Sequence, residues 1–299
     1  MGASGRAPPG RRIFAGAPLP AAALDGKAGR GHAVVVQSGV LIMSDGGFHP
    51  RRMLRDALIR LGLRQPPAEP DKLNLKAINV AFVKGLAKQM PHEAAMELAI
   101  GGGFEAIGPV EAGLLRHYGL ATDGYLIDVG CGSGRLAKPL SVDHTGAYLG
   151  IDLVPDLIAH AQKIVGRPDW RFEVIDHIGI PEADGRADMV CFFSVMTHLL
   201  HEQAYWYLEE ARRVLKPGGK IVFSFLEYAE PVHWDIFLET VKATKARAPI
   251  PLNVFMDRPT LTRWAHALGL EVVEIRSGRD VIAPAGNLGQ ALCVLAKPG

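Results

Sequence analysis

The chain has 299 residues, of which 48% are hydrophobic and 21% are charged, and its formal net charge is +2 at pH 7. This composition is that of a globular protein with one large domain, or one domain and an attachment. The near-neutral charge gives no global electrostatic reason to bind nucleic acid or an anionic membrane. The apolar stretch 33–43 is far shorter than the roughly 20 residues that a spanning helix needs. We therefore expect no membrane span and no nucleic-acid partner.

The chain has three cysteines, Cys131, Cys191 and Cys293, and no two of them form a Cys-x-x-Cys pair. An odd number of cysteines without such spacing favours reduced thiols and hence a cytoplasmic location. Cys131 lies in a glycine-rich turn, but no His–Asn or His–Asp pattern accompanies it, which argues against a nucleophilic role.

The N-terminal part of the chain differs from the rest in composition. Residues 1–42 are rich in Ala, Gly, Pro and Arg and show no helical or strand period, which predicts a disordered tail. A translation start at Met43 and a transit peptide are the alternatives. Apolar residues at helical spacing predict helices over 48–63 and 73–90, and one or two more over 104–120. The region 43–120 is thus expected to be a helical extension, either structural cover or a lid over a ligand.

After Tyr125 the pattern changes to alternating strands and helices. The predicted strands are 125–129, 147–151, 171–175, 187–193, 220–225, 271–276 and 290–296. The predicted helices are 134–140, 154–165, 202–215, 233–245 and 259–268. Near-continuous apolar strands such as "DMVCFFSV" are typical of a parallel sheet that is buried on both faces. The last two strands are joined by a short loop without a helix, so they should pair antiparallel.

These elements define the predicted fold class. It is an α/β fold with a seven-stranded, mostly parallel sheet, an antiparallel last strand and helices on both faces, plus the N-terminal helical extension. The α/β domain is expected to span residues 121–299. The segment "LKPGG" at 215–219 is interpreted as a helix stop followed by a turn, with a structural role only.

The glycine turn "DVGCGSG" is the most informative motif. Its glycines, Gly130, Gly132 and Gly134, follow a G-x-G-x-G spacing, and Arg135 stands where a dinucleotide fingerprint has its third glycine. Asp128 precedes the turn, and a carboxylate there would repel a phosphate. Both features argue against a nicotinamide-dependent oxidoreductase. A cationic nucleoside such as S-adenosylmethionine, which has no phosphate, fits better.

Acids also stand at the ends of the next two predicted strands. Asp152 ends "YLGID" and is placed to accept hydrogen bonds from both hydroxyls of a ribose. Asp176 ends "RFEVID" and is placed to accept from an adenine amino group, while the backbone amide of His177 is placed to reach a ring nitrogen.

Together with "GID", "VID", "MVCFFSVMTHLL" and "LKPGGKIVFS", the glycine turn resembles the class I S-adenosylmethionine-dependent methyltransferases over residues 104–298. The resemblance implies that Asp128 and the glycine turn hold the methionine part of the cofactor and that Ser194 lies near the transferred methyl group. The cofactor-binding set is Asp128, Gly130, Cys131, Gly132, Gly134, Asp152, Leu153, Asp176, His177 and Ser194.

Methyl transfer from a sulfonium needs a general base only if the acceptor atom holds a proton. His198 follows the fourth strand of the predicted domain, and Glu227 and His233 follow the fifth, so these three are the candidate catalytic residues. His198 and His201 lack a third metal ligand, so no metal site is expected. The expected acceptor is an O or N atom of a small molecule, namely a metabolite, a sugar or a lipid-like intermediate. A homodimer is left open.

Two other functions remain as alternatives. One is a non-catalytic S-adenosylmethionine-binding module that regulates a partner, which cofactor turnover would distinguish. The other is a lipid-modifying relative such as a cyclopropane synthase, which a lipid-binding tunnel in the N-terminal helices would support.

Overall fold

The computed structural model describes residues 34–37, 40–43, 75–248, 252–282 and 286–299. The predicted helix 48–63 lies outside these residues, as does most of the segment 1–42. Inside that segment, β1 (Val34–Gln37) and β2 (Val40–Met43) pair antiparallel as a two-stranded sheet, where the composition favoured disorder.

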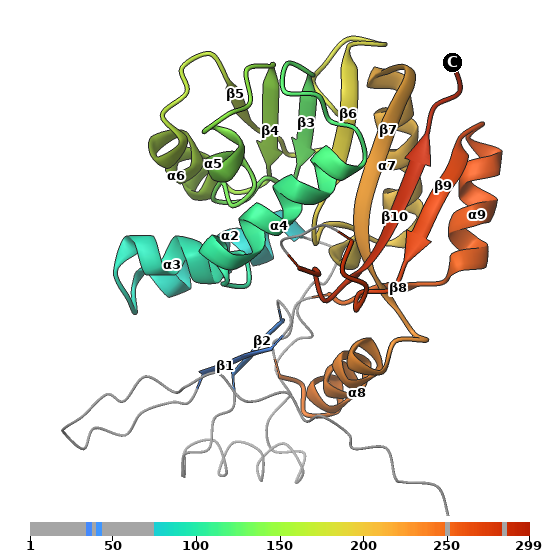
Figure 1. Ribbon diagram of the computed structural model, residues 1–299. Coiled ribbons are helices and arrows are strands. Elements are labelled where there is room, and N and C mark those ends of the chain that lie inside the picture. The colour runs from blue at the N-terminus through green and yellow to red at the C-terminus, as the bar shows by residue number, and fades with distance from the viewer. Residues whose placement is uncertain (1–33, 38–39, 44–74, 249–251, 283–285) are drawn as a thin grey trace, which may run out of the picture.

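The main sheet has the strand order β5-β4-β3-β6-β7-β10-β9 (Figure 1). The strands are β3 (Leu126–Val129), β4 (Tyr148–Asp152), β5 (Arg171–Val174), β6 (Ala187–Phe192), β7 (Leu215–Glu227), β9 (Glu271–Arg276) and β10 (Ala291–Ala296). β10 pairs antiparallel with both β7 and β9, whereas β3, β4, β5, β6 and β7 pair in parallel. The predicted seven-stranded sheet with its antiparallel last strand is confirmed. An eighth strand, β8 (Phe255–Met256), pairs with the end of β7 and was missed because it is only two residues long.

Helices cover both faces of this sheet (Figure 1). α7 (His201–Val214) and α9 (Arg258–Ala267) pack on one face, and α4 (Phe104–His117), α5 (Ala137–Leu140) and α6 (Pro155–Val165) on the other. Successive residues of a strand point to opposite faces of the sheet. Ile127 therefore packs in the core on the side of α7 and α9, and Leu126 in the core on the side of α4, α5 and α6. Burial on both faces explains why the central strands are almost wholly apolar.

Two further N-terminal helices lie at the carboxyl end of β4. These are α2 (Leu75–Ala87) and α3 (His92–Ala99), and their side chains Val83 and Met96 pack with Val154 and Leu157. The sequence analysis predicted one helix that ended at residue 90 and missed α3, which begins directly after Pro91. The helical extension therefore covers the edge of the sheet at which the acidic side chains of β3 and β4 stand.

Three predicted boundaries differ from the observed ones, each for a local reason. The helix predicted over 134–140 begins only at Ala137, because the positive φ angles of the turn glycines hold the preceding residues in a non-helical path. α8 (Pro231–Lys245) starts two residues early, with a proline in its first turn. The segment 215–219 lies inside β7, where the register against β6 shifts, and α7 does end just before it.

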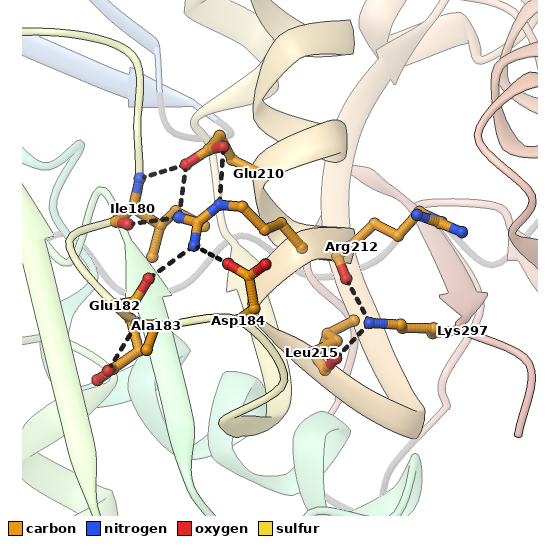
Figure 2. Close-up of polar contacts among 9 residues, drawn as sticks. Ile180, Glu182, Ala183, Asp184, Glu210, Arg212, Leu215 and Lys297 are labelled. Carbon is orange, nitrogen blue, oxygen red and sulfur yellow. Dashed lines mark hydrogen bonds and ion pairs between the residues drawn. The ribbon is translucent and has the colours of Figure 1, made fainter.

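An ion-pair network fixes α7 to the loop that precedes β6 (Figure 2). Arg213 donates to the Glu210 and Asp184 carboxylates and to the backbone oxygens of Ile180 and Glu182, at 2.7–3.0 Å. Nearby, the Lys297 ammonium donates to the last carbonyl groups of α7. A cation at a helix C-terminus is favourable because it satisfies carbonyl groups that have no partner within the helix.

Among the described residues, no single helix has both the length and the apolar composition for a membrane crossing. The bent pair of α3 and α4, at 45° to each other, meets those two criteria only when the two helices are taken together.

Candidate functional site

The glycine turn follows β3 and is held tightly against the end of β4. The amides of Gly130 and Cys131 both donate to the carbonyl oxygen of Ile151, at 2.7 and 3.1 Å. Gly130, Gly132 and Gly134 have φ angles of 74°, 55° and 92°, a region that favours glycine. The turn thus exposes backbone rather than side chains, as close approach of a ligand requires.

Asp152 stands beside this turn at the end of β4. One carboxylate oxygen accepts from the amide of Gly132 at 3.0 Å and the other from the amide of Val154 at 2.9 Å. Burial raises the pKa of Asp152, and the backbone hydrogen bonds oppose that rise. The next residue, Leu153, packs against the core formed by α2 and α3. The carboxylate that is predicted to bind the ribose is therefore positioned by the glycine turn itself.

Asp128 lies deeper, on the face of the sheet that α4 covers. Its side chain accepts from the Tyr148 hydroxyl at 2.7 Å and from the Cys191 thiol at 3.5 Å. Only 2% of the residue is exposed, and burial raises its pKa to about 7. Asp128 is thus a partly protonated acid below the glycine turn, and its carboxylate is already oriented by two neighbours.

Asp176 and His177 follow β5 and are 70% and 73% exposed. The His177 Nδ1 atom lies 3.2 Å from Asp176, and Lys76 of α2 lies 3.8 Å from the same carboxylate. The predicted adenine-binding residues therefore stand next to the helical extension.

Ser194 lies two residues after the end of β6 in a left-handed conformation, with φ of 59°. Its amide donates to the Ser224 hydroxyl at 2.8 Å, and its carbonyl oxygen accepts from the Thr197 hydroxyl at 3.0 Å. A non-glycine residue at this φ carries backbone strain, and such strain is concentrated at functional sites.

The histidines after β6 contact β8 and the segment that leads into it. His198 Nδ1 lies 2.6 Å from the carbonyl oxygen of Leu252, and His201 Nε2 lies 3.0 Å from that of Phe255. A carbonyl can only accept, so each of these nitrogens carries the hydrogen. Burial lowers the pKa of His198, which is therefore neutral and keeps a lone pair on Nε2. No group of three metal-ligand side chains occurs among the described residues.

Glu227 and His233 lie near the same edge but are engaged elsewhere. Arg258 donates to both Glu227 carboxylate oxygens, at 2.8 and 3.1 Å. His233 accepts from the Glu227 amide through Nδ1, and its Nε2 lies 2.8 Å from the Gly289 oxygen. Both ring nitrogens of His233 are thus used by the backbone, and Glu227 is used by a cation. In this arrangement His233 has no ring nitrogen free to accept a proton, and the Glu227 carboxylate is paired with the Arg258 cation.

A cavity of about 150 Å³ lies between the link from α3 to α4 and the ends of β6 and β7. It is lined by Gly101, Gly103, Ile107, Glu111, Arg135, Phe193, Ser194, Ser224, Leu288 and Gln290. Ser194 is the only predicted site residue in this lining. The sequence analysis missed the others, although two charged residues, Glu111 and Arg135, do stand in otherwise apolar stretches.

Glu111 and Arg135 form a buried ion pair that joins α4 to the glycine turn. Arg135 donates to both Glu111 oxygens, at 2.6 and 3.3 Å, and to the carbonyl oxygen of Ile100 at 3.2 Å. Burial raises the pKa of Glu111, and the neighbouring guanidinium opposes that rise. The helical extension is thereby bound to the predicted cofactor site.

Comparisons with known proteins relate part of the chain to methyltransferases. Residues 126–219 match a family model described as "Methyltransferase domain". The chain is 34% identical over 102 residues to a malonyl-[acyl-carrier protein] O-methyltransferase of Hahella chejuensis, covering 34% of this chain and 36% of that protein. It is 34% identical over 104 residues to a ubiquinone biosynthesis O-methyltransferase of Cereibacter sphaeroides, covering 34% and 40%. The chain thus spans well under half the length of these two curated relatives.

Solved structures show the same fold. A crystal structure of an S-adenosylmethionine-dependent methyltransferase from Methanosarcina mazei superposes with a TM-score of 0.50 at 18% identity, covering 62% of this chain and 97% of that one. This chain therefore has the α/β fold of that methyltransferase, and over residues 126–219 it is similar to a methyltransferase domain. The name of the Methanosarcina mazei protein gives S-adenosylmethionine as the cofactor of that protein.

The residues present fit that cofactor. A β-carbon on Gly130 or Gly132 would lie 2.3 or 2.6 Å from a neighbouring side chain, so the turn has no room for side chains of its own. The hydroxyl of Ser133 is buried within the turn and has no hydrogen-bond partner among the described residues. Two acids, the buried Asp128 and the half-buried Asp152, suit a ligand with an ammonium group and ribose hydroxyls and no phosphate.

Proposed function

We propose that the protein is a methyltransferase that transfers a methyl group from S-adenosylmethionine to an oxygen or nitrogen atom of a small molecule in the cytoplasm. The arrangement of Asp152 carries this proposal, since its carboxylate is fixed against the glycine turn by the amides of Gly132 and Val154. Both curated relatives are named as O-methyltransferases, which favours oxygen as the acceptor atom.

In this proposal, different residues of the site bind different parts of the cofactor. Asp152 binds the ribose, Asp176 and His177 bind the adenine end, and Leu153 packs beside them. Asp128 and the turn residues Gly130, Cys131, Gly132 and Gly134 bind the methionine end, with Ser194 near the methyl group. S-adenosylmethionine supplies the methyl group already activated on a sulfonium, so positioning contributes much of the rate.

His198 is the proposed general base for an acceptor that holds a proton. Its neutral ring donates through Nδ1 to Leu252, so the Nε2 lone pair is free to accept a proton. The engagement of Glu227 by Arg258 and of His233 by the backbone supports His198 over these two candidates. A homodimer also stays a proposal, which sedimentation would test.

The first test is a calorimetric titration with S-adenosylmethionine and, separately, with NADH. We expect binding of S-adenosylmethionine only, and its loss in Asp152→Ala. Asp156→Ala is the matched control, because Asp156 is an exposed acid in the first turn of α6, next to the site. Equal binding by wild type and Asp152→Ala would reject the assigned cofactor site. Binding without formation of S-adenosylhomocysteine over an acceptor panel would favour the regulatory module instead.

One observation favours a lipid-like acceptor over a metabolite or a sugar. Tyr228, Trp234 and Leu238 are 48%, 44% and 47% exposed, and they lie in or just before α8, beyond the end of β7. Exposed apolar groups in one area are typical of a binding surface. We expect a lower KM for a catechol with an isoprenoid tail than for the same catechol without it. Trp234→Ser should remove most of that difference, whereas an unchanged ratio would favour a short acceptor.

A further inference from the structure

The segment 252–256, which includes β8, lies against the turn that carries His198. Its backbone contacts this turn twice. The Val254 amide donates to the Thr197 carbonyl oxygen at 2.8 Å, and the Leu252 carbonyl oxygen accepts from His198 Nδ1 at 2.6 Å. The ring of the proposed base is therefore oriented by the backbone of this segment.

One side chain connects segment 252–256 to α8 by a hydrogen bond. Asn253 is the only polar residue of the segment, and its Nδ2 group donates to the Thr240 hydroxyl at 3.0 Å. The Thr240 hydroxyl donates in turn to the carbonyl oxygen of Ile236, one helical turn earlier, at 2.9 Å. A hydroxyl has one hydrogen, so Thr240 can only accept from Asn253. The direction of both hydrogen bonds is thereby fixed.

This connection bears on the tautomer of His198. A neutral imidazole carries its hydrogen on either of its two ring nitrogens. A carbonyl oxygen 2.6 Å from Nδ1 favours the tautomer with the hydrogen there. Nε2 then keeps the lone pair that a general base requires. Leu252 directly precedes Asn253, so the position of this carbonyl depends on the hydrogen bond to α8.

We propose that Asn253 and Thr240 are positioning residues for methyl transfer. They hold the Leu252 carbonyl against His198 Nδ1 and thereby keep Nε2 free to accept a proton. The inference rests on the proposed function, in which His198 is the base. The same hydrogen bond connects this base to α8, which carries Trp234 of the surface proposed to bind the acceptor.

The first experiment measures the tautomer directly. Full-length protein with nitrogen-15 in its histidine rings is studied by NMR, and the spectrum of His198→Gln identifies the His198 signals. In wild type, Nδ1 should have the chemical shift of a protonated nitrogen and Nε2 that of an unprotonated one. Thr240→Val removes the hydroxyl at nearly constant volume. In this variant the two shifts should move toward each other, because the second tautomer becomes populated.

Thr262→Val is the matched control. Thr262 of α9 also donates its hydroxyl to a carbonyl one turn earlier, that of Arg258 at 2.9 Å, but it has no hydrogen bond to segment 252–256 within the described part of the chain. This variant should keep the wild-type shifts, and so should Thr240→Ser, which retains the hydroxyl. Asn253→Ala removes the same hydrogen bond from the other side. It should reproduce Thr240→Val, so the test holds even if one of the two variants folds poorly.

The second experiment measures kcat with the catechol that carries an isoprenoid tail. Thr240→Val should lower kcat by about 2- to 10-fold, the contribution of one neutral hydrogen bond, and leave the KM for S-adenosylmethionine unchanged. In a His198→Gln background it should have no further effect, because it acts through the base. A merely structural role would lower kcat by the same factor in both backgrounds.

Wild-type shifts in both Thr240→Val and Asn253→Ala would overturn the inference, and so would a protonated Nε2 in wild type. Failure of the proposed function gives a different result, namely no methyl transfer by wild type or an unchanged kcat in His198→Gln. The tautomer measurement needs no turnover. In that case a change of shifts in Thr240→Val would still support the positioning of His198, and its absence would reject it.

Discussion

The Tyr148 hydroxyl donates a 2.7 Å hydrogen bond to the Asp128 carboxylate inside the core, below the glycine turn. The Tyr148 ring stacks on Trp170 with a centroid separation of 4.6 Å, so the hydroxyl is held in place. An acid with a pKa raised to about 7 is thereby fixed at the predicted methionine end of the cofactor site. The pH dependence of stability should reveal this acid.

The first prediction concerns that pH dependence. Unfolded Asp128 loses its proton near its ordinary pKa of 3.8, whereas folded Asp128 keeps it up to about pH 7. The folded state binds more protons in this window, so the Asp128 contribution to the free energy of unfolding falls as pH rises from about 4 to 7. Asp128→Asn lacks this contribution, so it should gain stability relative to wild type between pH 5 and 8. Urea unfolding of both proteins at pH 5 and at pH 8 measures this difference in the free energy of unfolding.

The same variant should bind S-adenosylmethionine more weakly at pH 8, because the amide has no charge to attract an ammonium group. A variant more stable but weaker in binding would show that the buried acid is kept for function at a cost in stability. A stability difference that does not change with pH would contradict the raised pKa.

The second prediction separates the two histidines after β6. His198→Gln should lower kcat by about 10²- to 10⁴-fold, the usual contribution of a general base. His201→Gln is the control, since His201 also donates to a backbone carbonyl, that of Phe255 in β8, and its loss should disturb that contact equally. Because the pKa of His198 is lowered, wild-type kcat should reach its plateau below pH 6.5. Equal loss in both variants would show a structural role only.

The third prediction tests the packing of the helical extension on the glycine turn. Gly132→Ala places a β-carbon 2.6 Å from Ile100 Cγ2, in addition to the strain of a positive φ. Gly166 has a similar φ of 64° with no atom within 4 Å, so Gly166→Ala measures the strain alone, about 1–2 kcal/mol. Thermal unfolding should show a larger loss of stability for Gly132→Ala than for Gly166→Ala. Adding Ile100→Ala should recover the excess, and its failure to do so would contradict the contact.

The fourth prediction concerns the ion pair between Arg135 and Glu111. Arg135→Leu leaves a buried carboxylate without its cation and should cost about 3–5 kcal/mol of unfolding free energy. The double variant Arg135→Leu/Glu111→Leu should regain most of that loss, since no charge then stays buried. Urea midpoints of the two single variants and the double variant give the coupling energy. Simple additivity of the two single effects would mean that the pair is not coupled.

The sequence predicted the sheet well because its signals are local. Apolar runs and the helical spacing of apolar residues depend on neighbours in the chain, and they predicted most strands and helices. The short loop before the last strand predicted the antiparallel end of the sheet. α3 was missed because it is a short helix of eight residues that begins directly after Pro91.

The polar partners inside the site could not be predicted in the same way. Arg135 meets Glu111 across 24 residues of sequence, and Ser224 meets Gln290 across 66. No local pattern marks such pairs, because folding alone brings them together. For the same reason Glu227 was a candidate base from the sequence alone. Nothing near it in the chain indicates Arg258, which donates to its carboxylate in the structure.

The position of β10 has a consequence for synthesis of the protein. β10 is made after β9 but lies between β9 and β7, so β9 has no partner in the main sheet until β10 leaves the ribosome. Until then the edge of β7 is open, and an unpaired strand edge invites contact with other chains. Gln290, which directly precedes β10, arrives in the same late step. A nascent chain that already carries the glycine turn would therefore have an incomplete site and an exposed strand, the state in which a chaperone would be most useful.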